Sequence, residues 1–353
     1  MSRTGARLFI FILTLLFTLQ LAHAQDEEPQ PLPEAFTLYG FTYIPQTWNN
    51  CGPATLTMGL TYFGWPADQQ LAADYLKPNY EDKNVSPWQM VDYVNTYVSG
   101  VGALLRVGGT LDTIRTMLVN EFPILIESGY DPVEDDQGWM GHYLLIVGYD
   151  DATETITTYD SFDGQNYPYT YAHVEEFWTH FNRTYIVLYQ AERESLLLTL
   201  LGTDADERQN AINALEQSRG MALDDPTNAF AWHNMGSNFV ALGMYQEGAV
   251  AFDQARTVGV GLPWRMFWYQ FGALEAYLAV GRYTDVIAIA QANLNDGGGQ
   301  YVEETYYYAG QAREGMGELE RAMSNYNAAI DFNPNFFPAI EARDALQQRM
   351  NGG

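Results

Sequence analysis

The decisive segment of this sequence is Ile44-Pro-Gln-Thr-Trp-Asn-Asn-Cys51-Gly-Pro-Ala-Thr-Leu-Thr-Met58, which contains the only cysteine of the chain. From Pro53 to Phe63 apolar residues recur at helical spacing, and a proline suits the first turn of a helix because its missing N–H is not needed there. Cys51 is therefore expected at or just before the N-terminus of a helix. That end of the helix dipole favours a thiolate and lowers the pKa of the thiol.

The residues around Cys51 suit a nucleophilic thiol. Gly52 leaves room for a substrate backbone to approach the sulfur. Gln46 lies five residues upstream of the cysteine, and its carboxamide could join the backbone N–H of Cys51 in facing a developing oxyanion. The alternatives are a buried structural thiol for Cys51 and an ordinary loop hydrogen bond for Gln46.

A thiol nucleophile needs a base, and the base needs a group that orients it. His142 stands near the start of the strand-like run Gly141–Tyr149, and Asp160 follows a second such run over 155–159. Two neighbouring strands would bring the imidazole and the carboxylate together. The alternatives are a satisfied core histidine for His142 and a turn acid for Asp160, with Asp163 as the rival orienting group.

These motifs resemble the C39-like peptidases, which are papain-type cysteine proteases. The matching residues are Gln46, Asn50-Cys51-Gly52-Pro53-Ala54, Gly141-His142-Tyr143 and Tyr159-Asp160. The resemblance covers about residues 40–190. It implies a papain-like fold and a catalytic set in which Cys51 attacks a peptide carbonyl and His142 takes its proton. In the same way it implies that Asp160 orients the histidine and that Gln46 contributes to the oxyanion hole.

The sequence departs from the family pattern in two respects. The Gln46–Cys51 spacing is five residues instead of the six of papain. The better-known C39 members are fused to export transporters and trim double-glycine leaders. No transporter sequence is present here, so leader trimming is not the expected reaction.

Composition limits the classes of function. The chain has 353 residues, of which 47% are hydrophobic, so two domains with sizeable cores are expected. Its formal net charge of −27 repels phosphate backbones and excludes nucleic acid as a natural partner. We find no phosphate loop, dinucleotide fingerprint or calcium loop and expect no cofactor and no metal. His173 and His180 do not have the spacing of a zinc site and are expected on the surface.

The first 24 residues have the pattern of a secretory signal peptide. A basic start precedes an apolar run over 8–21, and Ala22-His23-Ala24 matches the small-x-small cleavage site. The mature chain is expected to begin at Gln25 and to be secreted or extracytoplasmic; the alternative is retention of the segment as a membrane anchor. A lone cysteine in an exported protein can be oxidised or can react with other thiols. Its presence therefore indicates a function and favours a catalytic Cys51.

Beyond the signal, the sequence divides into three parts. Residues 25–37 are acidic and rich in proline and are expected to form a linker. Residues 38–190 mix strand-like and amphipathic runs, which predicts an α+β domain. Residues 191–353 lack strand-like runs and have helical periodicity to the end, which predicts an all-α domain.

The helical part repeats itself. A first unit carries Trp232, Gly236, Phe239, Gly243, Tyr245, Phe252 and Ala255, a looser middle copy carries Tyr277, Gly281 and Tyr283, and a later unit carries Gly310, Gly317, Ala322, Tyr326, Ala329 and Pro334. These offsets resemble the tetratricopeptide (TPR) family over about 225–334, which implies helix pairs whose concave face binds a protein. An ordinary helical bundle is the alternative.

The sequence thus predicts an exported cysteine peptidase that acts on peptide or protein substrates, with TPR repeats that recruit the substrate or a partner. Two alternatives stay open. One is a non-catalytic adaptor that uses a papain-like fold for binding. The other is an acyltransferase or amidase that uses the same three catalytic groups, because transfer differs from hydrolysis only in which nucleophile reaches the acyl-enzyme.

Overall fold

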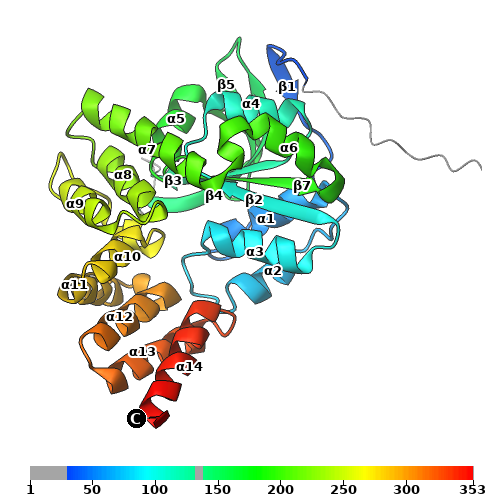
Figure 1. The fold of residues 1–353 in the computed structure, drawn as a ribbon. Coiled ribbons are helices and arrows are strands. Elements are labelled where there is room, and N and C mark those ends of the chain that lie inside the picture. The colour runs from blue at the N-terminus through cyan, green and yellow to red at the C-terminus, as the bar shows by residue number, and fades with distance from the viewer. Residues whose placement is uncertain (1–29, 132–137, 353) are drawn as a thin grey trace, which may run out of the picture.

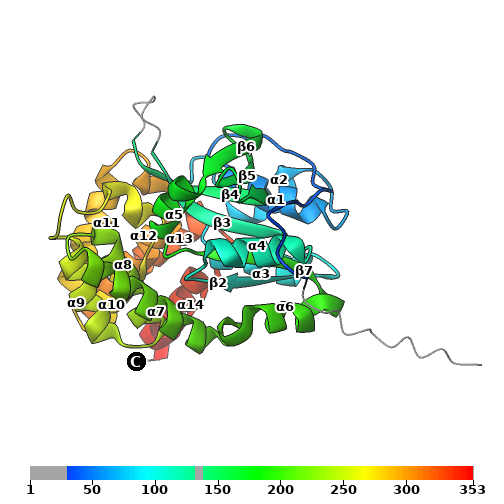
Figure 2. The ribbon, with the colours of Figure 1, turned by 90° about the horizontal axis from the view of Figure 1, so that it is seen from above.

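The computed structural model describes residues 30–131 and 138–352. The first part of the chain folds around a β-sheet, and the rest forms a curved stack of helices that runs from the sheet to the C-terminus (Figures 1 and 2). The predicted fold class, an α+β domain followed by an all-α repeat domain, is confirmed. The predicted signal peptide, residues 1–24, lies outside the described residues.

Seven strands form one antiparallel sheet in the order β2-β7-β3-β4-β5-β6, with β1 paired to the far end of β4. The strands are β1 (Ala35–Thr37), β2 (Val101–Arg106), β3 (Ile124–Tyr130), β4 (Met140–Asp150), β5 (Thr155–Asp160), β6 (Gly164–Thr170) and β7 (Tyr185–Gln190). The predicted linker 25–37 therefore ends in a strand: Phe36 lies opposite Tyr149 in the ladder. The acidic, proline-rich composition of residues 25–37 gave no indication of this short strand pairing.

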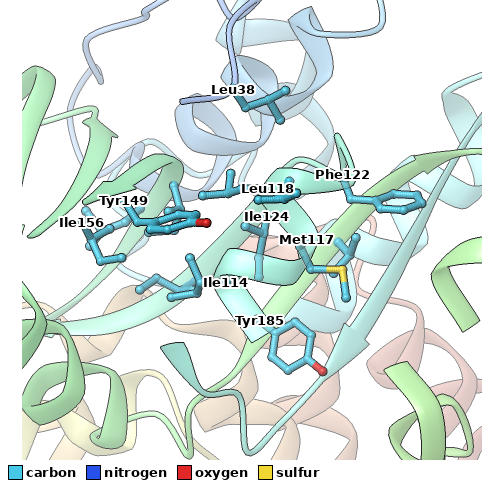
Figure 3. Close-up of a cluster of buried hydrophobic side chains, with 14 of the residues drawn as sticks. Leu38, Ile114, Met117, Leu118, Phe122, Ile124, Tyr149, Ile156 and Tyr185 are labelled. Carbon is cyan, nitrogen blue, oxygen red and sulfur yellow. The ribbon is translucent and has the colours of Figure 1, made fainter. Parts of the chain in front are cut away.

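Helices cover both faces of the sheet, and its central strands β3, β4 and β7 are accordingly buried on both sides. Those of the sheet domain are α1 (Cys51–Thr61), α2 (Gln69–Leu76), α3 (Pro87–Tyr97), α4 (Leu111–Val119), α5 (Tyr171–Thr179) and α6 (Glu194–Leu201). On β3, Ile124 and Ile126 join the core beneath α4, α5 and α6, part of which is drawn in Figure 3. The intervening Leu125 joins the opposite core, beneath α1, α2 and α3.

Helix α1 lies unusually close to the sheet. A Cβ atom built on Gly59 would stand 2.8 Å from Cδ1 of Leu188, so only a glycine allows this approach. The Thr55 hydroxyl also donates to the backbone oxygen of Tyr143 on β4. These contacts fix the N-terminus of α1 against β4.

The helical stack consists of α7 (Glu207–Asp224), α8 (Ala229–Ala241), α9 (Tyr245–Ala255), α10 (Gly272–Ala279), α11 (Tyr283–Asn295), α12 (Glu303–Gly315), α13 (Leu319–Phe332) and α14 (Phe337–Gly352). Gly243, Gly281 and Gly317 connect the helices of three successive pairs, with φ of 75°, 77° and 79°. This left-handed conformation is one that glycine adopts at no steric cost. The regular spacing of these glycines in the sequence therefore reflects the same backbone conformation at each of the three turns.

Packing within the pairs repeats as well. A Cβ atom on Gly236 would stand 2.8 Å from the Phe252 ring, and one on Gly310 would stand 2.5 Å from the Tyr326 ring. At the corresponding positions of the middle pair, the buried residues are Leu274 and Ala290. The small and the large side chain have exchanged places there, which keeps the volume between the helices filled.

The sheet domain does not end where the strands end. The predicted boundary at 190/191 follows β7, but Leu197 and Leu201 of α6 belong to the core on the sheet. The guanidinium of Arg106 also donates to the backbone oxygens of Asp204 and Ala205. The helical stack therefore starts with α7. Among the helices of the described residues, none is both long and apolar enough to cross a membrane.

Candidate active site

Cys51 is the first residue of α1. The backbone N–H of Ala54 donates to the oxygen of Asn50, which closes the first turn. Asn50 is buried, and its side-chain amide donates to Gln69 at the start of α2. The half-buried thiol thus stands at the positive end of a well-anchored helix, as the position of Pro53 predicts.

His142 and Asp160 meet across two neighbouring strands. The register of β4 and β5 places Asp160 opposite Leu144, two residues beyond His142. The imidazole Nε2 lies 2.8 Å from Oδ1 of Asp160, and both side chains are buried. The rival acid, Asp163, instead accepts hydrogen bonds from the hydroxyls of Tyr130 and Tyr169.

The Asp160 carboxylate is held by several donors. Its Oδ1 also accepts the backbone N–H groups of Phe162 and Asp163, and its Oδ2 accepts the Tyr169 hydroxyl. Burial alone would raise the pKa of this carboxyl. The charge and hydrogen bond of His142 and the two N–H groups outweigh that effect and lower the pKa to about 2. Asp160 is therefore ionised throughout the ordinary pH range.

Cys51 and His142 form a hydrogen-bonded pair. Burial raises the pKa of the thiol, but the hydrogen bond and charge of His142, with the backbone N–H groups of Tyr143 and Gly52, bring it below its ordinary value. Burial lowers the pKa of the imidazole, but the charge and hydrogen bond of Asp160 and the neighbouring sulfur raise it to about 10. The site therefore favours a thiolate beside an imidazolium, which is the reactive form of a cysteine nucleophile.

Gln46 is anchored next to this group. Its backbone N–H donates to the oxygen of Ser161 at 2.8 Å, and its carboxamide oxygen accepts the Ser161 hydroxyl at 2.8 Å. Because the carboxamide oxygen is engaged, the NH₂ group is the end available to a ligand. In the described part of the chain, no hydrogen bond joins Gln46 to Cys51.

Three tyrosines near the site were not identified from the sequence. The Tyr130 ring lies 5.4 Å from the imidazole of His142, and the Tyr169 hydroxyl binds Asp160. Tyr269 comes from the helical stack: a Cβ on Gly141 would stand 2.9 Å from its ring. The charge of Cys51 contributes, after burial, to raising the pKa of Tyr269. A contact with a residue 127 positions away from His142 has no local pattern that could reveal it.

Tyr269 also lines a large cavity between the two domains. The cavity has a volume of about 1000 Å³ and is walled by Ser86, Pro87 and Trp88 of the sheet domain and by helices of the stack. Its stack side is rich in aromatic residues, among them Tyr283. A volume of this size suits a ligand as large as a peptide segment.

His180 is not a surface residue, contrary to the sequence expectation. It is buried, its ring stacks on Phe230 at 3.8 Å, and its Nδ1 accepts the indole N–H of Trp139. Burial and, to a lesser degree, the charge of His173 lower its pKa to about 4. His173 is half-buried against Tyr169. Within residues 30–131 and 138–352, no three histidine, cysteine or carboxylate side chains are grouped to hold a metal ion.

Comparison with known proteins agrees with this architecture. Residues 38–186 match the model of the Peptidase_C39 like family. Because this match covers less than half of the chain, it describes the sheet domain and leaves the helical stack aside. No curated protein matches the chain significantly. The α+β part thus has a C39-like, papain-type fold, and the stack that follows it has the helix pairs of a TPR-like array.

Solved structures with similar parts include a protein described as a candidate C39-like peptidase from Bacillus anthracis, with 16% identity, a TM-score of 0.37, and coverage of 45% of this chain and 98% of that one. A MamA RS-1 ArsTM double mutant has 18% identity and a TM-score of 0.35, covering 44% and 85%. MamA from residue 41 to its end, from Desulfovibrio magneticus RS-1, has 18% identity and a TM-score of 0.36, covering 45% and 86%.

Proposed function

We propose that this protein is an exported cysteine peptidase in which Cys51 is the nucleophile, His142 the acid–base and Asp160 the orienting group. The observation that supports this function best is the continuous chain of contacts from the thiol through the imidazole to a buried, ionised carboxylate. A non-catalytic adaptor would not require the N-terminus of a helix, two backbone N–H groups and an imidazole to converge on one sulfur.

The proposed reaction has two stages. The Cys51 thiolate forms a bond to the carbonyl carbon of the substrate, and the imidazolium of His142 then gives its proton to the departing amine as the peptide bond breaks. His142, now neutral, takes a proton from water, whose hydroxide attacks the thioester and releases the acid. The backbone N–H of Cys51 and the NH₂ group of Gln46 are the proposed donors to the oxyanion.

The helical stack is proposed to hold the substrate chain or a protein partner. The interdomain cavity and the position of Tyr269 support this role, because this residue of the stack packs against Gly141, next to His142, and also lines the cavity. Export follows from the signal-like pattern of residues 1–24, which would deliver the mature chain from Gln25 to an extracytoplasmic compartment.

The test uses the chain from Gln25 onwards under reducing conditions. Wild type, Cys51→Ala, His142→Ala and, as a fold control, Asp163→Asn are compared for iodoacetamide labelling near pH 6 and for cleavage of a mixed peptide library. We expect fast labelling and cleavage for wild type and Asp163→Asn. His142→Ala should label slowly, Cys51→Ala should not label, and neither should cleave.

The same experiment separates the alternatives. If wild-type Cys51 reacts no faster than a free thiol and no peptide is cut, the thiolate–imidazolium pair is absent and the adaptor function replaces the peptidase. If cleavage appears only when an amine acceptor is added, and the products carry that amine, the enzyme is an acyltransferase with the same catalytic groups.

A further inference from the structure

Three carboxyl groups are buried where the sheet domain meets the far end of the helical stack. Asp82 lies in the loop between α2 and α3, and Glu303 and Glu304 are the first residues of α12. Their exposed fractions are only 1%, 1% and 3%. In Figure 1 this contact, which we call the acidic seam, lies where α2 and α3 approach the orange and red helices.

Polar side chains tie the acidic seam together across the two domains. Glu304 accepts hydrogen bonds at Oε1 from Asn84 and Ser86. Glu303 accepts them at Oε1 from Gln89 and from Asn333, whose side chain also donates to the backbone oxygen of Leu76. The seam is therefore a specific interface, in which one oxygen of each glutamate accepts hydrogen bonds from two side chains.

The second oxygen of each carboxyl group has no such donor. Asp82 Oδ2, Glu303 Oε2 and Glu304 Oε2 are buried and accept no hydrogen bond from an N–H or hydroxyl group among the described residues, and neither does Asn84 Oδ1. None of the ion pairs in the described part of the chain involves Asp82, Glu303 or Glu304. Asp82 and Glu303 are nevertheless in side-chain hydrogen-bonding contact. Two carboxyl groups can form that bond only if one of them carries a proton.

We propose that the acidic seam is a proton-dependent latch: a proton shared by Asp82 and Glu303 holds the sheet domain against α12, and its loss parts the two surfaces. The physical reason is that two or three carboxylates without a directly paired cation in a buried interface repel one another and are poorly solvated. Separation admits water and restores the solvation of the charges.

The charged and titratable groups around the seam agree with an opening that is caused by loss of a proton. Those that act on the three carboxyls are Lys77, Lys83, Tyr143 and Tyr308. Lys77 is engaged elsewhere, since its ammonium donates to the backbone oxygens of Trp48 and Tyr80. Burial, followed by the charges of Glu303 and Glu304, raises the pKa of Asp82 well above its ordinary value. Burial also raises the pKa of both glutamates.

The raised pKa values of the three carboxyl groups determine on which side of the pH scale the latch opens. A carboxyl whose pKa is raised in the folded state favours that state below its unfolded pKa and ceases to do so as the pH rises through the folded value. The latch is therefore closed in acid and opens on the alkaline side.

The latch is connected to the candidate active site through one loop. Asp82, Asn84 and Ser86 lie on the same segment as Val85, whose backbone oxygen accepts the Tyr143 hydroxyl. A Cβ on Gly52 would stand 3.3 Å from the Val85 side chain. Ser86, Glu304 and Tyr269 line the interdomain cavity, so opening the latch would widen that cavity.

The test is hydrogen exchange followed by mass spectrometry on the mature chain between about pH 5 and pH 8, with rates corrected for intrinsic exchange. Peptides covering 77–89 and 299–308 report on the acidic seam. We expect their corrected exchange to rise with pH by up to about tenfold per unit, because one proton is released on opening. Asp82→Asn and Glu303→Gln should each make the exchange nearly independent of pH.

An internal control lies at the other contact between the domains, which we call the neutral seam. There Asn182 donates to Asn238, and Asn234 donates to the backbone oxygen of Thr179. The nearby His180 has a pKa of about 4 and stays neutral over the tested range. Peptides from this seam should show no pH dependence after correction.

Two results would overturn the latch. One is a pH-dependent exchange of the acidic seam that Asp82→Asn and Glu303→Gln leave unchanged. The other is protection at pH 8 that calcium restores and a chelator abolishes, which would make the seam a cation site. The measurement needs no activity and can be repeated in Cys51→Ala, so failure of the latch and failure of the peptidase function are separate outcomes.

Discussion

The candidate active site and the acidic seam both bury three groups that titrate, but they balance charge in opposite ways. At Cys51, His142 and Asp160, a cation lies between two anionic groups, and each raises or lowers the pKa of its neighbour towards the charged form. At Asp82, Glu303 and Glu304, three acids meet without an ion pair to any cation in the described residues, and burial moves each pKa towards the neutral form.

The difference shows that burial does not by itself decide the charge of a group. The active site stays charged because opposite charges and N–H donors compensate for lost hydration, whereas the seam stays together only while protons remove its charge. The two regions therefore respond to pH differently. Asp160 stabilises the fold above its unfolded pKa and until the pH falls through about 2, whereas His142 does so below its unfolded pKa and until the pH rises through about 10.

The largest expected effect comes from neutralising the Asp160 carboxylate. This buried negative charge has no counterpart in the protonated acidic seam. Asp160→Asn keeps the shape but no longer stabilises the imidazolium or fixes the ring, so kcat should fall on the order of 10³–10⁴-fold. Steady-state cleavage of the best library peptide measures this. Asp163→Asn is the matched control and should stay within a few-fold; equal losses in both variants would contradict the assignment of Asp160.

The second effect concerns the pH range of the reactive pair. In wild type the thiolate–imidazolium form should persist between the lowered pKa of Cys51 and the pKa of about 10 at His142. Alkylation by iodoacetamide should therefore set in at a lower pH than for a free thiol and stay nearly constant above the lowered pKa of Cys51. In His142→Ala it should fall on the order of tenfold or more near pH 6 and then rise with pH as a free thiol does. Identical profiles would show that the imidazole does not act on the sulfur.

A third prediction tests the seam through stability. Glu303→Gln replaces a buried acid by a neutral group of the same shape, so it should raise the free energy of unfolding near pH 8 by about 1–3 kcal/mol and change it little near pH 5. Denaturant unfolding at the two pH values measures the difference. Glu320→Gln on the exposed face of α13 is the control and should have no effect at either pH. A destabilised Glu303→Gln at pH 8 would mean that the glutamate is ionised and compensated.

The smallest effect separates the chemistry of the active site from substrate contacts with the stack. Tyr269→Ala removes an aromatic surface that lines the cavity, so kcat/KM for peptides should fall by about tenfold, equivalent to one good side-chain contact. Labelling of Cys51 by the small reagent iodoacetamide should stay unchanged. Tyr269→Phe keeps the ring and should behave as wild type. If Tyr269→Ala slows labelling as well, the residue supports the thiolate itself.

Local sequence patterns were sufficient for several elements of the fold. Pro53 and the periodicity after it located a helix start at Cys51, and the spacing of Gly243, Gly281 and Gly317 located the turns of three helix pairs. Both are short-range effects, in which a residue type is required by the backbone conformation at its own position. The strand β1 escaped prediction because an edge pairing of three residues imposes little on composition.

The tertiary structure alone decided which groups meet. The sequence favours Asp160 but leaves Asp163 as a rival, and the register of β4 and β5 brings the imidazole to Asp160. Ser86 and Glu304 are 218 residues apart, and no local pattern marks their contact or the burial of the seam. Charge compensation depends on distances between side chains from different elements. The sequence thus determined the helix start at Cys51, the turns of the helix pairs and the candidate nucleophile, and packing determined which buried charges are balanced.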